Sequence, residues 1–515
     1  MKTRAWFSVL LAAGLMLGCG EGGMRISARR TDAFPGLFPD LIGVTIPPNI
    51  APLHFRVTGA EKAVIVRIHG DAGDTLTFRS PSAKVRIPGR RWRTLLANNR
   101  GRTFEVAVFA ERADGTWDAY DPFPVRVARE TVDNTLVYRE IGPVYLYWNR
   151  MRLVQRNLEN FRTSVILDNR RLGTACMNCH GFLDNDPGRM VMHVRRGPGP
   201  GTLLVDGRDI RKIDTRTDFN DHAAFASWHP SGDRIAFSVH AFKQFFHALG
   251  ENRDVVDLSS DLIVYDIRTH TVTTDPRIAD PAWMETWPAW SADGRFLYFC
   301  RAPRPEDWNL PYPEIARIRY DLVRIAYDEA EGFHGEVETV VDSRETGLSA
   351  AQPRVSPDGR WILFCLAEHG TFTAFRPSSD LYLLDTATGR FRKADCNSGR
   401  SESHHGWSSN SRWIVFGSKR RDGIHTLSYF SYVDGDGNCH KPFLLPREDP
   451  DDYAAEFMNY QLPELIVRPV PLPESRFIRA IYDRAVIRAG LDPEVRLREE
   501  SAVSTEMWLP GETRE

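Results

Sequence analysis

The sequence predicts a mainly β protein with several domains, and three features lead to that prediction. Its 515 residues exceed what a single hydrophobic core organises, so more than one domain is expected. Apolar residues alternate with period two in segments such as "AVIVRI" at 63–68, which is typical of strands. From residue 201 onward a unit of short strands and turns recurs at intervals of roughly 50–65 residues.

The composition is ordinary for a folded protein and excludes one class of partner. Hydrophobic residues make up 42% of the chain and charged residues 26%. The 66 basic and 68 acidic residues leave a formal net charge of -2, so there is no positive field to attract a polyanion. We therefore expect no nucleic-acid partner.

Residues 1–19 have the layout of a signal peptide. Two basic residues precede the apolar run Ala5–Leu17, and a glycine comes directly before Cys19. This ending resembles the lipobox of bacterial lipoproteins, which implies cleavage before Cys19 and a lipid anchor on it. A plain secretion signal that discards Cys19 is the alternative. Gly20, in place of an aspartate, favours an outer-membrane lipoprotein, periplasmic or surface-exposed, held to the membrane by Cys19.

Residues 24–140 are predicted to form a small β-sandwich. In "TFEVAVFA", Phe104, Val106 and Val108 fall on one face, and turn residues such as "ADGTW" at 113–117 separate the runs. Alternating short strands of this kind fit an immunoglobulin-like sandwich. Nothing catalytic stands out in this part of the chain.

Residues 141–200 are predicted to form a helical segment. Apolar residues recur there at intervals of three and four, which is the period of a helix. They are Tyr147, Met151, Val154, Leu158 and Phe161. We expect this helix to lead into "TACMNCHGF" at 174–182 and to pack against it.

Residues 201–465 contain the repeats. "SWHPSGDRIAF", "AWSADGRFLYF", "RVSPDGRWILF" and "HHGWSSNSRWIVF" each join a short strand through a turn to a strongly apolar strand. Two further strands follow each copy, and four strands at this period predict the blade of a β-propeller. Four blades are clear, with room for five or six. Residues 466–515 are expected to hold one amphipathic helix, Pro473–Ala489, and a tail.

The motif Cys176-x-x-Cys179-His180 carries the chemistry. A redox dithiol would need a βαβ context, and zinc would need a second pair of ligands; the sequence offers neither. A c-type haem needs two thiols for its vinyl groups and an adjacent imidazole for its iron, and the motif supplies these. We therefore expect one covalent haem c, with His180 as its proximal axial ligand.

The second axial ligand is left open among nearby donors. "GRMVMHVRRG" supplies Met190, Met192 and His193, one of which is expected to bind the iron. In a strand Met190 and Met192 share a face while His193 points the other way. His404 or His405 of "SHHGW" is a ligand option from the propeller, and the same pair is a weaker candidate for a separate metal site.

Four cysteines remain after the motif and Cys19. Cys300 and Cys365 occupy matching places in successive repeats and are expected as small core residues. Cys396 and Cys439 lie near matching loop ends, and a disulfide between them is one option.

The repeats, together with "CMNCHGF", "IPPNIAPLHF" and "HHGWSSNSRWIVFGSKRRDG", resemble bacterial TolB-like propeller lipoproteins that carry one c-type haem motif. The resemblance covers the mature chain and implies fold, haem and envelope location, but it supplies no substrate.

Three functions follow from these expectations. The first is an electron-transfer cytochrome that docks a redox partner protein of the cell envelope. The second is an enzyme whose propeller admits substrate to an open coordination site of the haem iron. The third is an interaction scaffold with a structural or sensory haem. Whether the protein is an enzyme is left open, and no catalytic residue is assigned.

Overall fold

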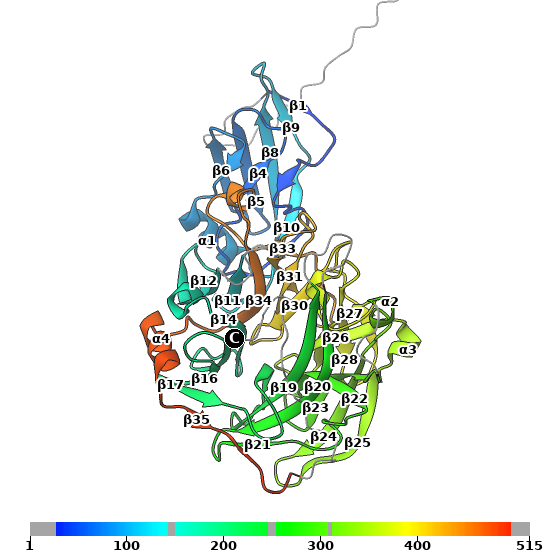
Figure 1. Ribbon diagram of the computed structural model, residues 1–515. Helices are drawn as coiled ribbons and strands as arrows, with labels where there is room; N and C mark the ends of the chain where they lie inside the picture. The colour runs from blue at the N-terminus through cyan, green and yellow to red at the C-terminus, as the bar shows by residue number, and fades with distance from the viewer. Residues whose placement is uncertain (1–26, 143–149, 246–253, 307–311, 496–515) are drawn as a thin grey trace, which may run out of the picture.

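The computed structural model describes residues 27–142, 150–245, 254–306 and 312–495 (Figure 1). It consists of a small β domain, seen at the top of Figure 1, and a propeller below it. Cys19 and the rest of the expected signal peptide lie outside the described residues. Within them, no helix is long and apolar enough to cross a membrane.

The N-terminal domain contains two sheets and one helix. The larger sheet joins seven strands, namely β1 (Ala28–Arg30), β3 (Thr45–Ile46), β5 (Val64–Gly70), β6 (Thr75–Ser80), β8 (Thr103–Glu111), β9 (Trp117–Ala119) and β10 (Phe123–Val127). The smaller sheet joins β2 (Leu37–Phe38), β4 (Phe55–Val57) and β7 (Lys84–Val85). The predicted period-two strands are confirmed, since β8 buries alternate residues. Helix α1 (Gly89–Asn98) was not predicted. The immunoglobulin type stays a prediction.

Six further sheets form the blades of a propeller in the described residues. Blade 1 contains β34 (Asn459–Ile466), β11 (Thr135–Ile141), β12 (Met151–Asn157) and β13 (Thr163–Asp168). Blade 2 contains β14 (Cys176–Phe182), β15 (Arg189–Arg195), β16 (Gly201–Asp206) and β17 (Asp209–Asp214). Blade 3 contains β18 (Ala223–Trp228), β19 (Arg234–Phe245), β20 (Asp254–Asp266) and β21 (Thr271–Thr273).

The remaining blades follow the same order. Blade 4 contains β22 (Trp283–Trp290), β23 (Phe296–Pro303), β24 (Asp321–Asp328) and β25 (Gly332–Val341). Blade 5 contains β26 (Ser349–Val355), β27 (Trp361–Ala367), β28 (Asp380–Asp385) and β29 (Phe391–Lys393). Blade 6 contains β30 (Glu402–Trp407), β31 (Trp413–Ser418), β32 (Leu427–Tyr432) and β33 (Phe443–Leu444). Short helical turns η2 (Asn169–Leu172), α2 (Tyr312–Ile315), α3 (Ser343–Thr346), η3 (Thr373–Phe375) and η4 (Pro450–Tyr453) lie in the connections.

The ring closes by joining the two ends of the propeller segment. The innermost strands β34, β14, β18, β22, β26 and β30 contact each other in this order, and β30 contacts β34. Strand β34 comes from the end of the segment but pairs with β11, at its beginning. A late strand therefore completes the first blade, which closes the sheets into a ring.

The prediction of a helical segment at 141–200 is wrong for the described residues. Tyr147 lies outside them, but Met151 and Val154 belong to strand β12, and blades 1 and 2 occupy the segment that was assigned to a helix. Met151 packs in the core shared by blades 1 and 2, whereas Val154 packs in another core that includes the N-terminal domain. Because a blade is covered on both faces, apolar residues three apart lie on opposite faces and imitate a helical period.

The C-terminal segment supports blades 2 and 3. Helix α4 (Glu474–Tyr482) confirms a helix here, although it ends earlier than Ala489, and it buries Phe477 and Ile481. After it, β35 (Ile487–Arg488) pairs with β17, and β36 (Gly490–Leu491) pairs with β21. The segment thus runs along the outer edges of two blades, at the lower left of Figure 1.

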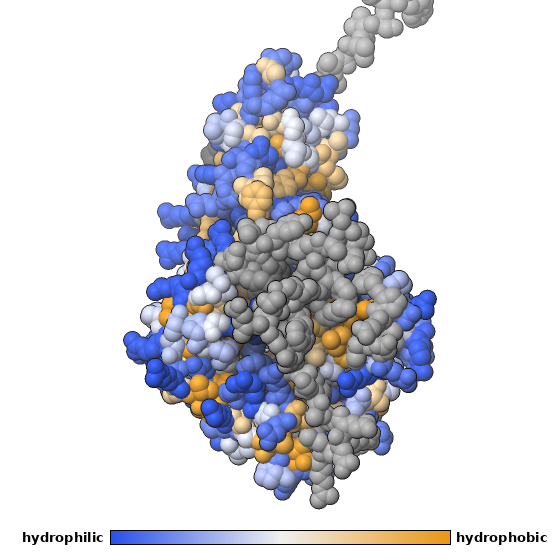
Figure 2. Space-filling view, in the orientation of Figure 1, coloured by the Kyte–Doolittle hydropathy of each residue, from blue (hydrophilic) through white to orange (hydrophobic). Residues whose placement is uncertain are grey.

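The N-terminal domain is fixed to the propeller through one shared core and polar contacts. Residues of both parts belong to the same buried cluster. Lys84 Nζ lies 3.0 Å from Asp449 Oδ2, and the Trp413 Nε1–H donates to the Glu130 carbonyl at 3.1 Å. On the face in Figure 2, the described surface is mostly hydrophilic, with apolar atoms in separate patches.

The cysteines outside the motif are buried. Cys300 and Cys365 are core residues, as predicted. Cys396 and Cys439 are free in the structure, and a hydrogen bond joins their thiols. The disulfide option is therefore not realised in this structure.

Candidate functional site: a cavity in the central channel

Each innermost strand carries a β-bulge at the same place. The register shifts in β14, β18, β22, β26, β30 and β34 fall at equivalent positions, three or four residues before the end of each strand. Such an extra residue bends the strand and redirects its side chain. At five of these bulges the residue adopts a left-handed conformation with φ between 45° and 56°. These are Phe225, Trp287, Gln352, His404 and Leu462. In β14 the equivalent residue is Cys179.

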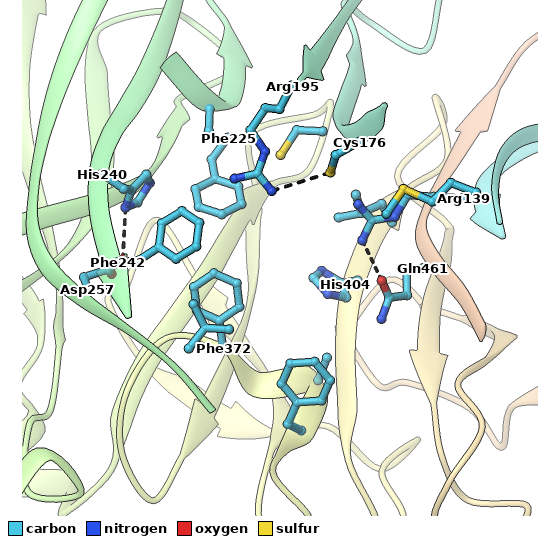
Figure 3. Close-up of a pocket in the computed structure, with 17 residues that line it drawn as sticks. Arg139, Cys176, Arg195, Phe225, His240, Phe242, Asp257, Phe372, His404 and Gln461 are labelled. Atoms are coloured by element: carbon cyan, nitrogen blue, oxygen red, sulfur yellow. Dashed lines mark hydrogen bonds and ion pairs between the residues drawn. The ribbon is translucent and has the colours of Figure 1, made fainter. Parts of the chain in front are cut away.

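Four of these six bulge residues line a cavity in the channel (Figure 3). They are Cys179, Phe225, His404 and Leu462. The cavity lies where β14 begins, between the long β19–β20 pair of blade 3 and the segment 372–375 of blade 5. Four phenylalanines line it, together with two arginines, Arg139 and Arg195. A largely apolar cavity with a few polar groups is typical of a small-molecule or cofactor site.

Both thiols of the motif line this cavity. Cys176 is 2% exposed and Cys179 is 8% exposed. The Arg195 Nη2–H donates to Cys176 Sγ at 3.5 Å. Burial raises the pKa of the Cys179 thiol, so it stays protonated at neutral pH. The two sulfurs are thus buried groups at one wall of the cavity.

His180 follows directly and is buried between β14 and β34. Its side chain has a hydrogen bond to the backbone of Leu462, and its Nε2 is buried with no hydrogen-bond partner among the described residues. Burial, and then the positive charge of Arg139, lower the pKa of His180 to about 3. The imidazole is therefore neutral, which is the form that binds a metal.

These residues fit a c-type haem. Two free thiols share one wall of the cavity, phenylalanines provide apolar surface for a porphyrin, and Arg139 and Arg195 provide positive charge for carboxylates. The imidazole next to Cys179 has one nitrogen held by the backbone and one without a partner, as a metal-ligating histidine does. His180 does not itself line the cavity but lies directly behind its wall.

The structure does not bring Met190, Met192 or His193 to the cavity. Met190 and Met192 share a face, as predicted, but that face packs in the core of blades 1 and 2. His193 lies on the other face, where its ring centre is 5.8 Å from that of His222 and its Nδ1 is 3.4 Å from Thr202 Oγ1. The β15 strand stands behind β14 in its blade, and only Arg195, at the end of β15, lines the cavity among the residues of this strand.

The side chains of His404 and His405 point to opposite faces of β30, as adjacent residues of a strand do. His404 lines the cavity, whereas His405 points between blades, and its Nε2 lies 2.9 Å from the Leu363 carbonyl oxygen. Burial is the main cause that lowers the pKa of each to about 3. No group of three or more histidine, cysteine, aspartate or glutamate side chains in the described residues is placed to hold a metal, which gives the separate metal site no support.

Several cavity residues were not singled out from the sequence. Arg139 lies in the range predicted as a β-sandwich, Arg195 lies in the range predicted as a helical segment, and His240 and Asp257 come from the long strands β19 and β20. In Figure 3, His240, Phe242 and Asp257 lie across the cavity from Arg139, Gln461 and Cys176. Only the propeller topology brings these distant segments together, and no local motif marks them.

Comparisons with known proteins add similarity of fold only. No protein-family model matches the chain, and no curated protein matches it. Among solved structures, it is similar to TolB from Acinetobacter baumannii, with 13% identity, a TM-score of 0.41, and coverage of 70% of this chain and 79% of that one.

Two other solved structures have comparable values. A nidogen/laminin complex gives 9% identity and a TM-score of 0.38, with coverage of 65% and 99%. A gluconolactonase from Xanthomonas campestris gives 13% identity and a TM-score of 0.34, with coverage of 61% and 88%. The six-bladed ring rests on the strand order described above.

Proposed function

We propose that this protein is a monohaem c-type cytochrome of the bacterial envelope, of the TolB-like propeller type, which transfers electrons to or from a docked redox partner. The observation that carries the proposal is the position of Cys176 and Cys179 on the wall of the channel cavity. Each thiol would add across one vinyl group of the haem, and His180 would bind the iron. When bound, the haem supplies a one-electron Fe(III)/Fe(II) couple.

The protein's own residues determine the surroundings of that couple. Four phenylalanines exclude water from much of the cavity, and Arg139 and Arg195 offer cationic hydrogen-bond donors to the haem carboxylates. The rigid blades limit rearrangement around the site, because every innermost strand is packed between two neighbours. Low rearrangement favours electron transfer.

A haem-dependent oxidoreductase is the second candidate, and the polar groups of the cavity favour it. His240, Asp257 and Gln461 line the cavity beside the apolar side chains and offer hydrogen-bonding groups to a small substrate. A scaffold with a structural or sensory haem is the remaining option, which no feature of the cavity favours.

The deciding experiment is spectroscopic. The protein is produced in a host with c-type haem maturation, and its haem content is measured after denaturing electrophoresis. One covalent haem with a low-spin spectrum that resists CO and cyanide supports electron transfer. High-spin iron that binds CO would instead support the oxidoreductase function. Absence of covalent haem refutes both.

The envelope location rests on Cys19. We expect the Cys19→Ala variant to move from the membrane fraction to the soluble periplasmic fraction, because acyl chains supply the membrane affinity. Unchanged fractionation would refute the lipid anchor without bearing on the haem.

A further inference from the structure

A buried histidine–carboxylate pair stands at the cavity wall facing the thiols. His240, on β19, places its Nδ1 3.1 Å from Asp257 Oδ1, on β20, and the two side chains are only 5% and 1% exposed. The second oxygen of Asp257 is 3.3 Å from the Tyr320 hydroxyl and 3.4 Å from Thr371 Oγ1. Both His240 and Asp257 line the cavity. The Asp257 carboxylate is thus positioned by two hydroxyl groups, and its contact with Nδ1 orients the His240 imidazole.

The other ring nitrogen of His240 lacks a comparable contact in the described residues. Its Nε2 is buried and has no hydrogen-bond partner within the described part of the chain. Leaving a buried polar nitrogen unsatisfied is unfavourable, so this atom at the cavity wall is available to a ligand. A histidine that donates one N–H to a carboxylate and presents its other nitrogen is the usual arrangement at a metal ion.

His240 is placed to approach a bound haem from the side opposite His180. His180 has a hydrogen bond to the backbone of Leu462 on β34, and His404 lies on β30, which contacts β34. Figure 3 shows His404 on the side of Arg139, whereas His240 lies across the cavity. Two axial ligands approach an iron from opposite sides, so His240 satisfies this geometry and His404 does not.

The aromatic contacts connect His240 to the motif. The ring of Phe225 packs edge-on against His240, with ring centres 4.9 Å apart, and the backbone of Phe225 has a hydrogen bond with the Cys179 thiol. A single side chain therefore separates the histidine from the thiol that would anchor the haem. A porphyrin bound at that thiol would occupy the space next to Phe225.

We propose that His240, oriented by Asp257, is the second axial ligand of the haem iron. This inference rests on the proposed function, since it requires the haem held by Cys176 and Cys179. It replaces Met190, Met192 and His193, which the blade packing keeps away from the cavity. Asp257 is a positioning residue: its negative charge makes the imidazole a stronger donor and so stabilises Fe(III).

The test compares single variants of the haem-loaded protein by optical and EPR spectra. His240→Ala should convert low-spin iron to high spin and open it to CO, while His404→Ala and His193→Ala should leave the low-spin spectrum in place. In the smaller His240→Gly variant, added imidazole should restore the low-spin spectrum. A lack of change in His240→Ala, or a conversion in His404→Ala or His193→Ala instead, would overturn the inference.

A second variant separates ligation from a general effect on folding. Asp257→Asn should keep the low-spin spectrum but raise the midpoint potential, because the ligand loses its negatively charged acceptor. Asp254→Asn, on the same strand, serves as the control and should leave the potential unchanged. An unchanged potential in Asp257→Asn counts against the positioning role.

The proposed function and this inference fail in different ways. Wild-type protein without covalent haem refutes the function and the inference with it. Wild-type protein with covalent, high-spin, CO-binding iron refutes the inference, while the haem assignment stands and the enzyme function takes the place of electron transfer.

Discussion

Strands β14 and β30 occupy equivalent places in the ring and carry similar sequences. Cys179-His180-Gly181-Phe182 in blade 2 matches His404-His405-Gly406-Trp407 in blade 6. In both strands the bulge residue lines the channel, and the next residue is a histidine buried between blades. The local backbone is the same, so differences between the two sites arise from their side chains.

The two buried histidines differ in how their nitrogens are used. Each has a hydrogen bond to the backbone of the bulge residue on the neighbouring innermost strand, Leu462 for His180 and Gln352 for His405. His405 also has its Nε2 2.9 Å from the Leu363 carbonyl oxygen, whereas the same atom of His180 has no partner in the described chain. At this equivalent position, the histidine of blade 6 uses its nitrogens for packing contacts, whereas the histidine of blade 2 has a nitrogen left for a ligand.

The largest expected effect concerns the thiols that distinguish β14. The Cys176→Ala/Cys179→Ala variant should lose all covalent haem, because no thioether can form. Haem staining after denaturing electrophoresis measures this. Cys300→Ala/Cys365→Ala, which removes two buried cysteines of blades 4 and 5, should retain haem. Retention in the first variant would contradict the assignment.

The second prediction separates the two histidines by spectrum. In haem-loaded protein, His180→Ala should remove the proximal ligand and abolish the low-spin spectrum, while His405→Ala should preserve it. Optical spectra with and without CO provide the measurement. Equal spectra in the two variants would show that the free nitrogen of His180 has no special role.

The sequence predicted the repeated strands and the motif but not their setting. Period-two apolar residues in β8 and the recurring turns are local signals, so they were readable. The strand β12 was not, because both of its faces are buried and its spacing resembles that of a helix. The sequence predicts a helix that leads into the motif; in the structure the motif lies in strand β14, and both thiols line the channel cavity.

The cavity itself was not predictable from local patterns. His240 and Asp257 become neighbours of Cys179 only through the packing of blade 3 against blade 2. His404 was named as an option, and the fold places it at the cavity by the left-handed turn of its bulge. Ligand candidates close in sequence, such as His193, were favoured because the position of β15 behind β14 was unknown.

The third prediction concerns stability, for which His405 should matter more than His180, the opposite of their expected effects on the haem spectrum. In the haem-free Cys176→Ala/Cys179→Ala background, His405→Ala should lower the free energy of unfolding by about 2–3 kcal/mol, because it leaves a cavity and an unpaired carbonyl. His180→Ala should cost about 1 kcal/mol, since it also removes an unsatisfied nitrogen. Denaturant unfolding measures both. A larger loss in His180→Ala would contradict the comparison.

The smallest effect is a pH dependence. The pKa of His405 is lowered to about 3 in the folded protein, against about 6.5 in an unfolded chain, so unfolding takes up a proton between these values. Its contribution to stability is complete above pH 6.5 and falls toward pH 3, by up to about 1.4 kcal/mol per pH unit. His405→Gln should reduce that slope.

The control for the pH series is His69→Gln, because His69 is exposed on the N-terminal domain. This variant should follow the wild-type slope in denaturant unfolding across pH 3–6.5. An unchanged slope in His405→Gln would show that the buried histidine of blade 6 does not govern the acid sensitivity.

The closure of the ring by β34 also dictates an order of assembly. Strand β14 leaves the ribosome long before β34, which completes blade 1 and contacts β14 in the finished ring. In that ring Cys176 and Cys179 are almost inaccessible. Under the proposed function, haem attachment would therefore have to reach both sulfurs while the propeller is still open, before the last strand closes the ring.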